Sequence, residues 1–262
     1  MKRRKSLRKS LAVLLGTVAV LLAVSVAFGA TLAEIKARGT LNLGLEDEDW
    51  GRFHMWKNNT ASGFDVDLAE KIAAAAGVSL KIVPLPWGDG DAGSVSGAWS
   101  PGGWPPFDVD LILSGVTITP ERAAYVTFSE PYFTSGQMVL FRKAAPITDA
   151  AALAGKKLGV QQATTSESVA RERFGSSTIF IFAAVPEMLD ALRAGALDAI
   201  LLDSPFALTE AKEDASLAVL EELFSSEEFG VVLPKDVDPA LKALVDEVVR
   251  QEKDALCEKW FK

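Results

Sequence analysis

The chain has 262 residues, a net charge of −8 and a hydrophobic fraction of 49%, so it can build one large domain or two lobes with separate cores. One histidine and one cysteine exclude a multi-histidine metal centre and an intramolecular disulfide. We expect no metal and no cofactor, and the acidic balance disfavours nucleic acid and anionic membranes as partners.

Residues 1–29 are predicted to be a secretory signal peptide. Residues 1–9 hold six basic and no acidic side chains, and residues 11–28 form an uncharged apolar run. The run is long for a signal peptide core, so an uncleaved membrane anchor is the alternative. Cleavage would leave 21 Lys and Arg against 35 Asp and Glu, a net charge of about −14. The mature protein is expected in the periplasm or another extracytoplasmic space.

The exported part opens with a short helix followed by a β-α-β unit. Thr31 and Glu34 have the spacing of a capping box, and a glycine follows the short helix. Alternation predicts a strand at 40–45, a helical period predicts a helix at 65–76, and a second strand follows at 78–83. This order implies parallel strands joined by a right-handed crossover.

Residues 88–106 do not fit that pattern. They are rich in Gly, Ser, Pro and Trp and have neither a helical nor a strand period. The GDGDAG run at 88–93 matches a dinucleotide-binding motif only formally, because no helix follows it and its aspartates repel phosphate. We interpret the segment as a surface insertion, or alternatively as a rim of a ligand cleft that alters ligand size or partner contact.

An arginine in the first turn of a predicted helix is the leading candidate for ligand binding. Residues 109–113 read as a buried strand that ends at Ser114. Thr119 is a good N-cap and Pro120 suits the first helical position, so Arg122 follows within the same turn. A helix N-terminus with a guanidinium beside it favours a small carboxylate. A solvated arginine on an ordinary helix is the alternative.

The second half of the chain repeats the alternation of strands and helices. Strands are predicted at 157–161, 178–182 and 198–202, and helices from 165, at 186–194 and from 238. The segments 109–115 and 197–203 look like internal counterparts, since both are apolar strands that end on polar residues. Two α/β lobes of similar design are therefore expected.

Two further groups complete a clamp for an α-amino acid. Thr164 and Thr165 lie at a strand-to-helix turn that offers a second set of donors to an anion. Asp203 follows an apolar strand, where its carboxylate would meet an ammonium group or, alternatively, cap the next helix. His54 is interpreted as a rim or packing residue, and no nucleophile elbow is present, which disfavours a hydrolase.

Four motifs resemble the family 3 extracellular solute-binding proteins, the polar amino-acid-binding proteins of ABC importers. They are GFDVDLAEKIAAAAGV (63–78), SGVTITPERAAYVTFSEPY (114–132), GKKLGVQQATTSES (155–168) and LDAILLDSP (197–205). The resemblance covers nearly all of the exported part, but the chain departs from it after Trp87, where relatives continue with an amphipathic segment and this chain has residues 88–106.

The resemblance implies an α/β fold of the type II periplasmic-binding-protein (Venus-flytrap) kind. Each lobe then contains a mixed, mostly parallel sheet flanked by helices, and a two-strand hinge lets the lobes close over the ligand. Lobe 1 is expected to comprise residues 31–134 and 228–262, and lobe 2 residues 135–227.

The resemblance also assigns expected roles to site residues. Arg122 grips the α-carboxylate, helped by the backbone at Thr117 and by the turn at Thr164 and Thr165. Asp203 takes the α-ammonium.

Four further positions complete the implied site. Ser114 and Gly115 contribute oxygen acceptors for the α-ammonium. Trp50, three positions before a phenylalanine, stacks on the ligand side chain, and Asp47 is an acidic position that faces the pocket.

The implied function is capture of a free polar L-amino acid and delivery to an ABC permease by a monomeric, non-enzymatic protein. The acidic run at 46–49 favours a basic or other polar side chain on the ligand. Two alternatives stay open: a cleft enzyme such as a cyclohexadienyl dehydratase, and a sensory ligand-binding module.

Overall fold

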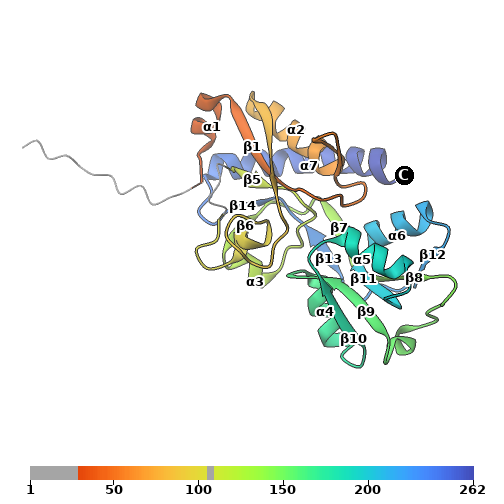
Figure 1. The fold of residues 1–262 in the computed structure, drawn as a ribbon. Coiled ribbons are helices and arrows are strands. Elements are labelled where there is room, and N and C mark those ends of the chain that lie inside the picture. Colours follow the sequence, from red (N-terminus) through yellow and green to blue (C-terminus); the bar gives the residue numbers. More distant parts are fainter. Residues whose placement is uncertain (1–28, 105–108) are drawn as a thin grey trace, which may run out of the picture.

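The computed structural model describes residues 29–104 and 109–262, which form two α/β lobes joined by a pair of antiparallel strands (Figure 1). The predicted signal peptide, or anchor, lies outside the described residues except for its last position. Within the described part of the chain, no helix combines the length and the apolar character that crossing a membrane requires.

Lobe 1 contains a five-stranded sheet in the order β4-β1-β5-β14-β6. Its strands are β1 (Thr40–Glu46), β4 (Ser79–Leu85), β5 (Leu111–Ile112), β6 (Val126–Phe128) and β14 (Val232–Pro234). Its helices are α1 (Leu32–Arg38), α2 (Phe64–Ala76), α3 (Pro120–Ala123) and α7 (Pro239–Phe261), and a hairpin joins β2 (Met55–Lys57) to β3 (Thr60–Ser62). Strands β4, β1 and β5 are parallel, whereas β14 is antiparallel to β5 and β6.

Lobe 2 repeats this plan with the order β10-β9-β11-β8-β12. Its strands are β8 (Gln137–Arg142), β9 (Lys157–Gln161), β10 (Thr178–Phe182), β11 (Ala199–Asp203) and β12 (Leu217–Val219). Its helices are α4 (Thr165–Arg173), α5 (Val185–Arg193) and α6 (Ser204–Glu213), with a 3₁₀ turn at Ala150–Leu153. Strands β10, β9 and β11 are parallel, and β8 is antiparallel to β11 and β12.

The two sheets confirm the predicted fold class. Strands β5 and β11, the expected internal counterparts, both occupy the central position of their sheet. Parallel strands gather their carboxyl ends at one edge, and that edge is where open α/β sheets bind ligands. The ends of β1, β5, β9 and β11 therefore supply the site described below.

Local chemistry explains the element boundaries. Thr31 and Glu34 form the predicted capping box, and Gly39 ends α1 in the left-handed conformation. Helix α3 is only one turn long, and the chain then reaches β6 at Val126, which pairs with β14. The helix-terminus contribution to anion binding near Arg122 is correspondingly small.

The hinge is a two-stranded ladder of β7 (Phe133–Ser135) and β13 (Glu227–Phe229). The lobe boundaries expected from the sequence fall inside these two strands. Phe133 and Phe229 stack there, and Phe229 also packs against Phe53 and Trp50 of lobe 1. Trp50 in turn stacks on Phe206 of α6 in lobe 2, so one aromatic cluster runs from lobe to lobe through the hinge.

The segment after β4 is a packed element rather than a loose insertion. It contains a 3₁₀ turn at Ser96–Trp99, and Val95 and Ala98 are buried in a small apolar core with Leu85 of β4. Backbone hydrogen bonds fold it back on itself, since the Val95 amide donates to the Pro86 carbonyl at 2.9 Å. Residues 105–108 of this segment lie outside the described part.

Candidate ligand-binding site

The carboxyl ends of the strands enclose a cavity of about 20 Å³ between the lobes. Eight of the nine predicted site residues line it, namely Trp50, Ser114, Gly115, Thr117, Arg122, Thr164, Thr165 and Asp203. The sequence did not single out its other lining residues, Glu46, Trp87 and Gln161. A space of this size holds about one water molecule, so a larger guest enters only when the lobes separate.

Arg122 is buried, with 6% of its surface exposed, and its guanidinium contacts both lobes. Nη1 donates to the Thr117 carbonyl at 2.9 Å in lobe 1, and Nη2 donates to the Ala163 carbonyl at 3.4 Å in lobe 2. Desolvation lowers its pKa to about 10, although Glu227 and Asp203 oppose that shift. The solvated-arginine alternative does not describe this side chain.

The turn before α4 presents hydroxyl and backbone groups to the cavity. Thr164 caps α4 by accepting from the Glu167 amide at 3.3 Å. Ala163 holds a left-handed φ of 55°, a conformation that is uncommon outside glycine. The Ala163 amide donates to the Glu167 carboxylate at 3.0 Å, which stabilises the turn.

Asp203 is the last residue of β11 and stands at the N-cap of α6, but its side chain makes no capping hydrogen bond. Instead Oδ1 accepts from Ser135 Oγ at 3.2 Å and from Gln137 Nε2 at 3.0 Å. Desolvation raises its pKa to about 8, and the charge of Glu227 adds to the shift. The carboxyl thus faces the cleft rather than the helix.

Glu227 on hinge strand β13 is a second carboxylate that the sequence did not single out. Its Oε2 accepts from the hydroxyls of Thr117 in lobe 1 and Thr165 in lobe 2, both at 2.8 Å. The side chain is buried and joins both lobes at the hinge. In the sequence, Glu227 is visible only as part of an acidic pair at 227–228 before an apolar stretch. Pairs of acidic residues are common on protein surfaces, so this pattern did not point to a buried site.

Glu46 occupies the cavity where Asp47 was expected, which corrects that prediction. Glu46 ends β1, is 3% exposed, and accepts from Gln161 Nε2 of lobe 2 at 3.3 Å. Side chains of successive strand residues point to opposite faces, so Asp47 points away from the cleft and is exposed. Burial raises the pKa of Glu46 to about 7.

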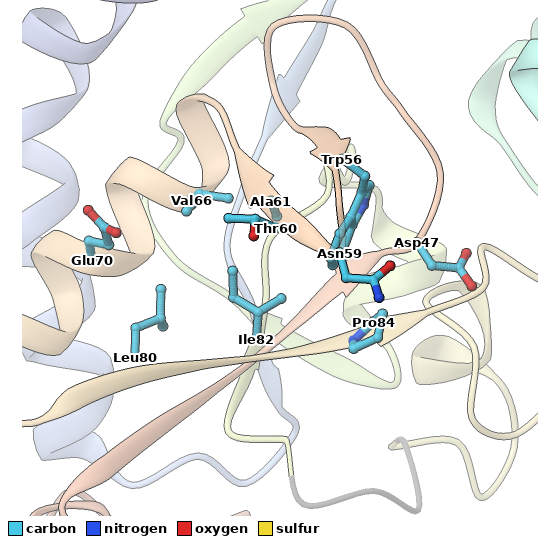
Figure 2. A pocket seen from close by; sticks show the side chains of 10 residues that line it. All are labelled: Asp47, Trp56, Asn59, Thr60, Ala61, Val66, Glu70, Leu80, Ile82 and Pro84. Carbon is cyan, nitrogen blue, oxygen red and sulfur yellow. The ribbon is translucent and has the colours of Figure 1, made fainter.

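Asp47 instead lines a hollow of about 830 Å³ on the outside of lobe 1. Figure 2 shows it beside Pro84 of β4, opposite Trp56 and Asn59 of the β2–β3 hairpin. The floor is formed by apolar side chains of α2 and β4, including Ile82. This hollow contains no other predicted site residue.

The Trp50 ring packs directly against Gly115. Gly115 has a φ of 57°, and a Cβ built there would lie 2.2 Å from the Trp50 ring. Only glycine lets this indole pack against the backbone beside the cavity. The Gly115 amide donates to the Tyr132 hydroxyl at 3.1 Å, which fixes the turn from behind.

His54 is a packing residue rather than a rim residue, and its buried surroundings include polar groups. It is fully buried, with Nδ1 3.0 Å from Asp65 Oδ2 and Nε2 3.9 Å from Glu46 Oε2. Tyr132 donates to the other oxygen of Asp65 at 3.3 Å. A buried polar chain therefore supports Glu46 and Gly115 from inside lobe 1.

The chain matches a known protein family over most of its length. Residues 41–262 match the model of the bacterial extracellular solute-binding proteins, family 3. The chain belongs to this family.

Within residues 29–104 and 109–262, no group of three His, Cys, Asp or Glu side chains is placed to hold a metal ion.

Individual family 3 relatives bind different amino acids. The L-cystine-binding protein TcyJ of Escherichia coli is 34% identical over 237 residues, which is 88% of this chain and 85% of TcyJ. The arginine-bound form of truncated ArgBP from T. maritima is 33% identical with a TM-score of 0.72, over 84% of this chain and 99% of that one. The ancestral amino acid-binding protein AncCDT-1 is 36% identical with a TM-score of 0.78, over 89% and 100%.

We predict that Gly115→Ala destabilises the protein by about 1–3 kcal/mol, because the new Cβ overlaps the Trp50 ring and the backbone φ is positive. Urea denaturation measures the loss. Gly155→Ala is the matched control, since its φ of 71° is similar but no atom lies within 4 Å of its Cβ. Equal losses for the two variants would contradict close packing of Trp50 on Gly115.

Proposed function

We propose that this protein captures a free L-amino acid in the cleft between its lobes and delivers it to the permease of an ABC importer. The observation that carries the proposal is that the buried Arg122 and the carboxyl groups of Glu46 and Asp203 line the same small cavity. A zwitterion needs a cation for its carboxylate and an anion for its ammonium. Family 3 membership supports an extracytoplasmic binding role.

The α-carboxylate is assigned to Arg122 and the turn at Thr164 and Thr165, and the α-ammonium to Asp203. Arg122 carries permanent charge and a planar fork that suits a carboxylate. In the described structure its hydrogen-bond partners are the Thr117 and Ala163 carbonyls. These are neutral groups, so no direct ion pair with a described residue balances the charge of Arg122. Asp203 lies at the end of β11 and lines the same cavity, where an ammonium would neutralise it.

The ligand side chain is assigned to Glu46, Gln161 and Trp50, and we infer that it is basic. Glu46 is a buried carboxyl that lies 3.9 Å from the imidazole Nε2 of His54, and a guanidinium or ammonium would offer it a charged partner. Trp50 offers an aromatic face beside it. The arginine-bound relative supports this choice, whereas the L-cystine-binding and glutamine-binding relatives are the competing precedents.

Closure is proposed to follow binding as a population shift, because several contacts require both lobes to be together. Gln161 donates to Glu46 at 3.3 Å, and Trp87 Nε1 donates to the Gln162 carbonyl at 2.9 Å. A ligand that contacts both Arg122 and Asp203 contacts both lobes, so it favours a closed arrangement with more room than the present cavity of about 20 Å³. The closed form is then the state presented to the permease.

Arg122→Ala should weaken L-arginine binding by about 2–5 kcal/mol, because it removes the partner of the buried carboxylate. Isothermal titration calorimetry measures the affinity. Arg250→Ala on α7 is the control, since its guanidinium is half exposed and pairs only with surface carboxylates. An affinity of Arg122→Ala within twofold of the wild type would refute the assignment.

The affinity for L-arginine should rise with pH between about 6 and 8. The pKa values of Glu46 and Asp203 are raised to about 7 and about 8, so below these values a proton competes with the cationic groups of the ligand. We expect binding at least about tenfold weaker at pH 6 than at pH 8.5, by calorimetry. Glu46→Gln should flatten the profile, and an unchanged slope in that variant would contradict the role of Glu46.

A dehydratase on the same fold is a second candidate function. It is favoured by the raised pKa of Asp203, because a carboxyl that keeps its proton near neutral pH is able to act as a general acid. The relative AncCDT-1 is described as a precursor of cyclohexadienyl dehydratase. Incubation with prephenate and arogenate, followed by ultraviolet absorbance, separates the two functions. Formation of an aromatic product would favour the dehydratase function over amino-acid capture.

A further inference from the structure

Two tryptophans of the segment after β4 lie near Arg122, one over its guanidinium and one lining the same cavity. Trp87 lines the cavity between the lobes, and the ring of Trp99 covers the Arg122 guanidinium, with Cζ 4.4 Å from the ring centroid. The two indoles contact each other edge to face, with centroids 5.9 Å apart and an interplanar angle of 61°. We call Trp87 and Trp99 the tryptophan pair.

Trp99 restricts how the guanidinium of Arg122 is oriented. Hydrogen bonds to the Thr117 and Ala163 carbonyls hold the edge of the guanidinium group, while the indole covers a face. A cation over an aromatic ring is stabilised more strongly when water is excluded, as it is around this buried side chain. The ring therefore keeps Arg122 directed into the cavity.

Trp87 makes a contact that depends on lobe closure. It is anchored in lobe 1, directly after β4, yet its Nε1 donates to the Gln162 carbonyl of lobe 2 at 2.9 Å. Gln162 is adjacent to Ala163, which accepts from Arg122. One stretch of lobe 2 backbone thus receives a hydrogen bond from Trp87 and another from the cation that Trp99 covers.

The segment that carries the pair is fixed to lobe 1 by its own packing. Val95 and Ala98 are buried, and the Ser96 amide donates to the Trp87 carbonyl at 2.9 Å. A Cβ at Gly97 would lie 2.0 Å from the Asp91 carbonyl oxygen, so the backbone approaches itself closely there. The pair is held in place on lobe 1 independently of contact with lobe 2.

We propose that the tryptophan pair sets the lifetime of the closed, ligand-bound form: Trp99 is a positioning residue for Arg122, and Trp87 is a closure contact with lobe 2. This inference rests on the proposed function, since it requires an amino acid in the cleft. It assigns the Gly- and Ser-rich segment the rim role, in place of a surface insertion.

Stopped-flow binding of L-arginine tests the proposal with four variants. Trp87→Phe keeps a ring but removes the donor, and we expect dissociation about 3–10-fold faster with little change in association. Trp99→Leu should weaken the affinity about tenfold, and Trp99→Tyr should restore part of it because an aromatic face returns. Trp104→Phe is the control, since the indole of Trp104 donates to the Val109 carbonyl of lobe 1 at 3.2 Å and, among the described residues, makes no hydrogen bond to lobe 2.

The outcomes separate the inference from the proposed function. Suppose that the wild type binds L-arginine, but Trp87→Phe dissociates at the wild-type rate and Trp99→Leu keeps the wild-type affinity. This result would overturn the inference about the tryptophan pair and leave the proposed function standing, whatever the melting temperatures of the variants. If the wild type does not bind L-arginine, the basic ligand is wrong, and the same measurements with L-cystine and L-glutamine decide the inference. If none of the three binds, both proposals fail.

Discussion

The rest of the site depends on the burial of one guanidinium. Removing Arg122 from water is costly, and its pKa is lowered to about 10 even though three carboxylates act in the opposite direction. The partners that offset this cost come from different parts of the chain: the Thr117 carbonyl from lobe 1, the Ala163 carbonyl from lobe 2 and the Trp99 ring from the segment after β4. Because the partners of one charge are spread in this way, the solvation of Arg122 is coupled to the relative position of the lobes.

The carboxyl groups around the cleft are the complement of that cation. Glu46, Asp203 and Glu227 outnumber Arg122, and desolvation raises the pKa of the first two. In a closed cleft of this composition, positive charge on a guest is favoured, because each added cation lets a buried acid ionise at lower cost. Selectivity for the side chain then arises from a charge difference rather than from shape alone.

Much of the fold followed from the sequence because its determinants are local. Periodicity placed the parallel strands of both sheets (β1, β4, β5, β9, β10 and β11) and most of the helices, but it did not predict the antiparallel strands. Eight predicted residues line one cavity beside the ends of these parallel strands. The exchange of Asp47 for Glu46 is a one-residue error at a strand end, where it reverses the direction of the side chain. Glu227 could not be found in this way, since its role comes from hinge pairing between distant strands. Trp99 was equally hidden, because its segment has no period to orient it.

In the proposed function, a few contacts made by the hinge and by the segment after β4 control the closure of the two lobes. The aromatic cluster of Trp50, Phe206 and Phe229 spans the hinge, and its apolar burial has no strong directional preference. The hydrogen bonds from Trp87 to Gln162 and from Gln161 to Glu46 are directional and exist only when the lobes meet. A ligand that bound both arrangements equally would shift nothing. A guest whose carboxylate lies on Arg122 of lobe 1 and whose ammonium lies on Asp203 of lobe 2 would be bound best when the lobes are together, and that difference in affinity is the free energy available to drive the proposed closure.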